Sequence, residues 1–256
     1  MMVYILVLLM TLFSGSAQAQ IDDYAAEPIQ EVKEQKSVAG ILRSNDKETL
    51  KKLLDEGLDV NQRDDEGDTM LVFTLANNDN LEMAKILLEA GADVNAPSQR
   101  DGITPLLVAT SMANEVQKQT IKIYGSPDSI NQSKIVGDNL IENIQAQMEY
   151  AAAIVKLLIE YGVDVDRETP YGTPLMNAST NEWNANIIDM LLKAGADVNK
   201  KDRNGRTALF YASAYNCNNI LSQLMAADAD IDVKDAFGKT YMEAEKQDLV
   251  IDPEQN

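Results

Sequence analysis

Short amphipathic stripes along this chain end repeatedly in one phrase: a leucine pair, a glycine, then an acidic–apolar–polar triplet. The copies read LLDEGLDVN at 53–61, LLEAGADVN at 87–95, LLIEYGVDVD at 157–166 and LLKAGADVN at 191–199, with a weaker LMAADADID at 224–232. Glycine adopts the left-handed conformation that closes many helices without strain. Each good copy therefore predicts a helix end followed by a short extended arm.

A second phrase, in which a threonine precedes apolar residues, lies between successive copies of the first. It reads GDTML at 67–71, GITPLL at 102–107, GTPLM at 172–176, GRTAL at 205–209 and GKTYM at 238–242. A threonine that accepts a backbone N–H, and a proline in the first turn, predict helix starts. Leu53 and Leu87 are 34 residues apart, as are Leu157 and Leu191. A fixed step predicts a solenoid whose units bury one another's apolar faces.

The two alternating phrases resemble the ankyrin repeat, whose pattern is roughly G-x-T-P-L-H-x-A-A and then V-x-x-L-L-x-x-G-A-D-V-N. The resemblance covers about residues 37–247 and implies an all-α ankyrin-repeat solenoid of helix-turn-helix units joined by β-hairpin loops. This chain departs from the pattern at its histidine, where Val72, Leu107, Met176 and Phe210 stand. Packing is expected to replace the polar bond of that histidine.

The phrases divide the chain into units. We expect a signal peptide at 1–19, a polar linker or N-terminal cap at 20–36, full repeats at 37–63, 64–97, 98–168, 169–201 and 202–234, a half-repeat at 235–247 that supplies one helix, and a tail at 248–256. The repeats share one apolar spine because no single unit can bury its apolar face alone.

The third repeat carries an insertion, placed at 111–148. Leu71 and Leu87 are 16 residues apart, whereas the corresponding Leu106 and Leu157 are 51 apart. Apolar residues at helical spacing flank a GSPD turn at 125–128, which predicts that both helices lengthen into a helical hairpin. The hairpin should project from the edge opposite the β-hairpin tips. The alternative is a structureless loop, which is unusual at this length in a compact domain.

The first nineteen residues differ from the rest. An apolar run at 3–13 precedes Ala17-Gln18-Ala19, which fits the small-x-small rule for signal cleavage after Ala19. No Lys or Arg precedes the run, so only the terminal amine is positive. The alternative is an uncleaved anchor, but the run is short for a bilayer. An ankyrin-like array behind such a signal resembles a secreted or periplasmic bacterial protein.

Charge narrows the class of partner. The net charge is −19, so a nucleic acid or an anionic membrane surface would be repelled. We expect no membrane contact after signal cleavage, a monomer, and a protein partner that is basic. The alternative is that the acidity only keeps the protein soluble. Hydrophobic residues make up 45% of the chain, too many for a disordered protein.

Residues able to carry catalysis or bind a metal are scarce. The chain has no histidine and one cysteine, Cys217, which excludes an internal disulfide and the usual nucleophile–histidine pairs. We interpret Cys217 as a packing residue; the alternative is a reactive or intermolecular thiol. Asp228, Asp230 and Asp232 lack the glycine and glutamate that a calcium loop requires. We predict no catalytic residue, no cofactor and no metal site.

The resemblance places partner contacts on the concave face, at the hairpin tips and the exposed ends of the first helices. The candidates are Tyr171, Trp183, Tyr215, Phe237, Arg203, Arg206, Asn181, Asn77, Arg100 and Asp101. Aromatic residues rank first because they anchor interfaces more often than other types do. Trp183 has an equal alternative as a core residue. Tyr171 stands where the turn glycine is expected, which leaves its exposure open.

Three functions are compatible with these features. The first is a non-catalytic protein–protein interaction module in the periplasm. The second is narrower: an immunity or inhibitor protein against a secreted toxin enzyme, or an accessory factor for a periplasmic oxidative-stress enzyme, both suggested only by the resemblance. The third is an enzyme with a carboxylate site under the insertion. Fold alone does not choose among them.

Overall fold

The computed structural model describes residues 37–77, 81–112 and 138–244. For residues 138–144 it describes the backbone but not the side chains. The chain divides into two units at Lys36, and all described residues belong to the second, Ser37–Asn256. The predicted signal peptide at 1–19, the linker at 20–36, most of the insertion and the tail at 248–256 therefore lie outside the described residues.

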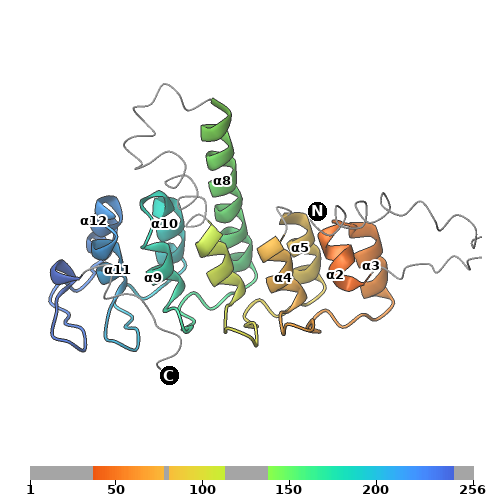
Figure 1. Ribbon diagram of the computed structural model, residues 1–256, viewed down its shortest axis with the longest axis horizontal. Coiled ribbons are helices and arrows are strands. Elements are labelled where there is room, and N and C mark those ends of the chain that lie inside the picture. The colour runs from red at the N-terminus through yellow and green to blue at the C-terminus, as the bar shows by residue number, and fades with distance from the viewer. Residues whose placement is uncertain (1–36, 78–80, 113–137, 245–256) are drawn as a thin grey trace, which may run out of the picture. The chain divides into compact units, whose positions relative to one another are not determined.

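The second unit consists of paired helices in a row (Figure 1). The first helices of the pairs are α2 (Val38–Arg43), α4 (Met70–Asn77), residues 105–112, α9 (Pro174–Ala178) and α11 (Ala208–Ala214). The second helices are α3 (Lys47–Asp55), α5 (Leu81–Glu89), α8 (Asp138–Glu160), α10 (Ala185–Lys193) and α12 (Asn218–Ala226). Two short 3₁₀ turns are η1 (Glu182–Asn184) and η2 (Tyr241–Glu243). Second helices contact second helices in order, α3 to α5, α8, α10 and α12. The predicted all-α solenoid is confirmed.

Threonines begin the first helices as predicted, with one exception. The Oγ1 atoms of Thr69, Thr104 and Thr173 accept the N–H groups of Val72, Leu107 and Met176 at 3.2, 3.2 and 3.3 Å. The prediction is wrong at Thr207, whose buried Oγ1 has no hydrogen-bond partner among the described residues. There the N–H of Phe210 donates to the carbonyl of Thr207 instead, at 3.0 Å.

The residues that replace the histidine of the pattern are all buried, as expected: Val72, Leu107, Met176 and Phe210. Met176 does more than pack, because its sulfur accepts the N–H of Thr173 at 3.4 Å. That contact closes a reciprocal cap between the two residues. A polar contact is therefore retained at one of the four positions.

Second helices end at glycines in the left-handed region, with φ of 98° at Gly57 and 94° at Gly195. The last phrase lacks this glycine, and Asp228 takes the same conformation with φ of 62°. Aspartate tolerates that region better than most residues do. The weak fifth copy is therefore a structural equivalent of the other four.

Two buried clusters form the core, and they meet across the second repeat. Met70 and Phe73 of α4 belong to the cluster nearer the N-terminus, whereas Leu71 and Leu75 of the same helix belong to the larger cluster that extends to Leu224. One face of α4 thus packs with the first repeat, and the opposite face packs with the third. This arrangement is the nearest-neighbour packing that a solenoid requires.

Polar bonds also join successive units. The last residue of one phrase accepts the backbone N–H of the aspartate in the next: Asn61 from Asp93 at 2.8 Å, Asn95 from Asp164 at 2.8 Å, Asp166 from Asp197 at 3.0 Å, and Asn199 from Asp230 at 2.7 Å. The Asn or Asp that ends each phrase is therefore explained by an inter-repeat bond. Asp230 takes part in this ladder through its backbone N–H.

The helix α8 has 23 residues, against nine in α5 and α10. Figure 1 shows its N-terminal half rising beyond the neighbouring helices, away from the hairpin turns. The predicted lengthening of the second helix is confirmed; its expected partner at 113–137 lies outside the described residues. No helix in the described ranges has the length and apolarity to cross a membrane.

One smaller expectation is corrected. The hairpin arms contain no strand within the described residues; isolated bridges join Arg63 to Thr69 and Thr169 to Gly172. The described part of the half-repeat contains the three-residue 3₁₀ helix η2, and its residues 245–247 lie outside the described residues. In that turn the carboxylate of Glu243 accepts the backbone N–H of Thr240 at 2.8 Å.

Candidate functional site

The turns between units share one hydrogen-bonded geometry. A side-chain oxygen at the start of each turn accepts the N–H two residues later: Asp64 from Glu66 at 3.0 Å, Ser98 from Arg100 at 3.3 Å, Thr169 from Tyr171 at 3.1 Å, Asp202 from Asn204 at 2.8 Å, and Asp235 from Phe237 at 2.9 Å. Short polar side chains favour such turns because they bond their own backbone. We call the five donor residues, Glu66, Arg100, Tyr171, Asn204 and Phe237, the tip row.

Adjacent tips are held close to one another. Gly67 has a φ of 85°, and a Cβ atom at this position would lie 2.9 Å from the Cβ of Gln99. The carbonyl of Gly67 accepts the N–H of Gln99 at 3.1 Å, and the carbonyl of Asn204 accepts that of Ala236 at 2.8 Å. Backbone hydrogen bonds therefore join the first turn to the second and the fourth to the fifth before any partner binds, which reduces the entropy lost on binding.

Several predicted contact residues are exposed. Phe237 and Tyr171, in the turns, are 72% and 41% exposed, and Tyr215, which follows α11 at the end away from the turn, is 36% exposed. Arg203 in the fourth turn is also exposed. The exposure of Tyr171, left open by the sequence, follows from its position two residues after Thr169.

Asn77, Arg100 and Asp101 differ in how they are engaged. Asn77 is exposed at the end of α4 and donates to the carbonyl of Phe73 at 2.9 Å. The guanidinium of Arg100 pairs with Glu66 and lies 3.5 Å from Asp101. The carboxylates of Asp68 and Asp101 raise the pKa of Arg100. Asp101 Oδ1 also accepts the N–H of Ile103 at 3.1 Å, so this carboxylate shapes the turn.

Two predicted contact residues are corrected because they are buried. Arg206 is 4% exposed; its Nε lies 3.5 Å from Asp235 Oδ2, and its guanidinium lies 5.8 Å from the centre of the Phe237 ring. Asn181 is fully buried, and its Oδ1 accepts the N–H of Trp183 at 2.9 Å. Arg206 therefore supports the exposed ring of Phe237, and Asn181 begins η1.

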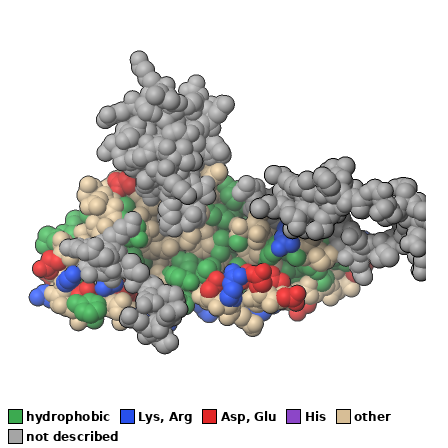
Figure 2. All heavy atoms as spheres, in the orientation of Figure 1, with side chains coloured by type: hydrophobic (Ala, Val, Ile, Leu, Met, Phe, Trp, Pro, Cys, Tyr) green, Lys and Arg blue, Asp and Glu red, His purple; other side chains and the backbone are tan. Residues whose placement is uncertain are grey.

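Charge varies along the tip row. The turn that carries Glu66 also contains the carboxylates of Asp64 and Asp65, whereas Arg203 and the aromatic ring of Phe237 lie in the last two turns. Figure 2 shows acidic and basic side chains close together on the hairpin side of the molecule. The surface therefore offers carboxylates in its first turn, an exposed cation in its fourth turn and an exposed aromatic ring in its fifth.

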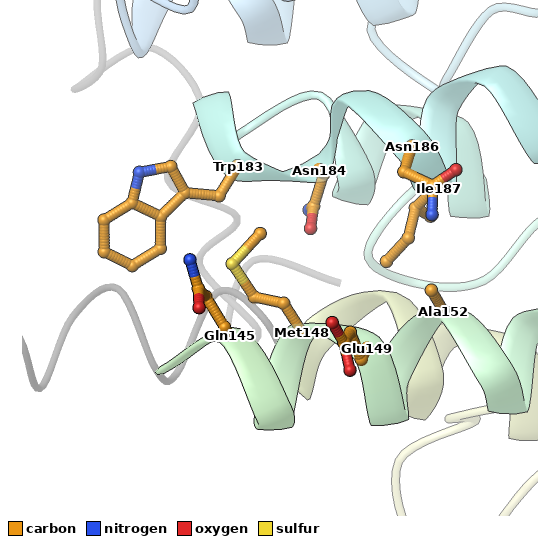
Figure 3. A pocket seen from close by; sticks show the side chains of 8 residues that line it. All are labelled: Gln145, Met148, Glu149, Ala152, Trp183, Asn184, Asn186 and Ile187. Carbon is orange, nitrogen blue, oxygen red and sulfur yellow. The ribbon is translucent and has the colours of Figure 1, made fainter. Parts of the chain in front are cut away.

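Trp183 lies apart from the tips, on η1 between α9 and α10. It lines a cavity of about 350 Å³ with Met148, Glu149 and Ile187. Figure 3 shows its ring near Gln145 and Met148 of α8. The side chain is half-buried. It therefore packs partly as a core residue and is partly accessible to a partner, the two alternatives that the sequence left open. The residues that face it across the cavity belong to α8, the helix lengthened by the insertion, and none of the lining residues belongs to a hairpin turn.

The described residues give little support to catalysis under the insertion. Glu149 is the one carboxylate among the residues lining the cavity beside α8. In the described ranges, no group of three or more His, Cys, Asp or Glu residues is arranged to hold a metal ion. Residues 113–137 of the insertion lie outside those ranges.

Cys217 is buried, with 3% of its surface exposed. Burial, assisted by the nearby carboxylate of Glu182, raises the pKa of its thiol to about 12. The thiolate is the reactive form, so this environment disfavours reaction at neutral pH. The structure supports the interpretation of Cys217 as a packing residue.

Sequence reasoning placed Arg63 at a hairpin tip but missed that Arg63 and Tyr211 support the turns. Nη1 of Arg63 donates to the carbonyls of Gly67 and Pro97, both at 2.7 Å, and so links two turns. The hydroxyl of Tyr211 donates to Asp202 Oδ2 at 2.9 Å, and burial raises the pKa of Tyr211. Pro97 belongs to the next unit, so no local spacing marks the role of Arg63.

The sequence was compared with models of protein families and with curated proteins. A family model described as ankyrin repeats (3 copies) matches residues 39–122 and 144–235. The two matched segments together span more than half of the chain. The comparison with curated proteins finds no match.

Proposed function

The chain belongs to the ankyrin-repeat family, and on that premise we propose that it binds a partner protein through the tip row and the adjacent ends of the first helices. Ankyrin repeats generally mediate protein–protein interaction, and the family is typically non-catalytic. The observation that carries the proposal is the exposure of Phe237 and Tyr171 on turns whose backbones are fixed by hydrogen bonds. Aromatic side chains on a preorganised surface are favourable interface anchors.

We further propose that the partner is basic and that binding takes place in the periplasm. The net charge of −19 and the carboxylates at the N-terminal end of the tip row favour a basic protein. The periplasmic location is supported by the signal-like pattern of residues 1–19. Inhibition of a toxin enzyme and support of an oxidative-stress enzyme are two forms of this activity. Both require that a partner protein be bound.

Replacing Phe237 or Tyr171 with alanine is expected to weaken partner binding by about 2 kcal/mol each, or roughly thirtyfold. The partner is first identified by affinity capture from periplasmic extract, and its dissociation constant is then measured by calorimetry. Tyr161→Ala is the matched control, because Tyr161 is 38% exposed but directly follows the second helix α8 and lies outside the tip row.

Each variant must also retain the thermal unfolding midpoint of the parent chain to within a few degrees. If Tyr161→Ala weakened binding as much as Tyr171→Ala, or if neither tip variant changed it, the tip row would not be the interface.

A further inference from the structure

A second cavity, of about 230 Å³, lies where a hairpin turn meets the first helices of the first two repeats. Its apolar wall includes Leu42 of α2 and Met70 and Phe73 of α4. Carboxylates of Asp65 and Asp68 line the same cavity from the turn. Apolar wall and carboxylates together suit a side chain with a long alkyl stem and a cationic end.

The environment of Asp68 also favours a cationic occupant. Its side chain is 13% exposed, and its Oδ1 atom is buried without a hydrogen-bond partner among the described residues. Its Oδ2 lies 3.9 Å from Nη2 of Arg100, beyond hydrogen-bond distance. A buried acceptor without a donor is unfavourable. A cationic group in the cavity would gain a favourable charge interaction with the carboxylate of Asp68.

Two described arginines at the cavity already have other contacts. Arg63 lines the cavity, but its Nη1 donates to two backbone carbonyls at 2.7 Å. Arg43 places its guanidinium 5.1 Å from the centre of the Phe73 ring. The stretch 20–36, which precedes the first repeat, carries five acidic and two basic side chains. Its net negative charge makes it a poor occupant of a cavity lined by carboxylates.

We propose that this cavity receives a lysine or arginine side chain of the partner protein. The alkyl stem packs against Met70 and Phe73, and the cationic group lies at Asp65 and Asp68. The proposal rests on the proposed function and specifies the chemistry of one contact within it. Phe237 and Tyr171 lie in other turns, so the cavity can be tested separately from them.

The test is a titration of the isotope-labelled full chain, followed by amide chemical shifts, with the peptides acetyl-Ala-Ala-X-Ala-Ala-amide. The residue X is lysine, arginine or norleucine, which has a similar stem without charge. Lysine and arginine peptides are expected to shift amides of residues 64–73 and to bind about three- to tenfold more tightly than the norleucine peptide. Asp68→Asn should reduce that preference to near unity. Asp55→Asn, an equal charge change at an exposed position on α3, should leave it intact.

Three outcomes would overturn the proposal. Equal binding of the norleucine peptide would show that charge is irrelevant. Equal losses in Asp68→Asn and Asp55→Asn would show general attraction to an acidic protein. Nuclear Overhauser contacts between Phe73 and residues 20–36 in the unbound chain would show that the chain fills its own cavity. The peptides need no natural partner, so failure here is distinct from failure of the tip variants.

Discussion

Leu191→Ala is expected to lower the free energy of unfolding by about 3–4 kcal/mol. Leu191 is fully buried in α10, within the larger core cluster. Its removal leaves a cavity at the point where α10 packs between α8 and α12. Neighbouring units stabilise one another in a solenoid, so the loss should be felt on both sides of the fourth repeat. Urea unfolding followed by circular dichroism measures the change.

The adjacent leucine of the same phrase supplies the control. Leu192 is only partly buried where it packs against this cluster, so Leu192→Ala should cost about 1 kcal/mol. The two substitutions remove the same atoms from neighbouring positions on one helix. Equal effects would mean that burial between units does not determine stability, contrary to the stacked arrangement.

Arg206→Met is expected to cost about 3 kcal/mol, because it leaves a buried carboxylate without its cation. The side chains of Arg206 and Asp235 are 5% and 2% exposed. Asp235 cannot move away freely, since its Oδ1 accepts the N–H groups of Phe237 and Lys239, both at 2.9 Å. Arg203→Met, in the same turn but exposed, should change the unfolding free energy by less than about 0.5 kcal/mol.

A double variant separates the charge pair from the packing of the long arginine side chain. Asp235→Asn keeps an Oδ1 acceptor for the turn and removes the buried charge. Arg206→Met combined with Asp235→Asn should therefore be less destabilised than the sum of the single variants, by about 1–2 kcal/mol. Strictly additive effects in urea unfolding would show that the two residues are not coupled.

The fold could be predicted because its determinants are local and repeated. Thr173 followed by Pro174 starts a helix, Gly195 ends one, and the recurrence of both shows that the units stack. The exception at Thr207 could not be predicted in this way. Its hydroxyl lost the expected bond because the backbone of the same turn took the donor, at Phe210. The sequence does not reveal which of two local acceptors prevails.

The candidate site could be predicted only in part. Tyr171 and Phe237 were identified from their places in the turns, and both are exposed. Arg206 lies in an equivalent turn but is buried, because its guanidinium pairs with the buried carboxylate of Asp235 in the next turn. Trp183 faces α8, whose position depends on an insertion that the repeat pattern does not describe. Sequence reasoning missed contacts with a neighbouring unit, such as that of Arg63 with Pro97, and also a contact within one unit, that of Tyr211 with Asp202.

The most direct test of the binding surface is amide hydrogen exchange on the full chain, with and without the captured partner. Binding through the tips predicts slower exchange in the turns at 64–68, 98–103, 169–173, 202–206 and 235–239. Exchange in the second helices α3, α5, α10 and α12 should be unchanged. Protection confined to α8 and the cavity beside Trp183, with unaltered exchange in the turns, would contradict the account.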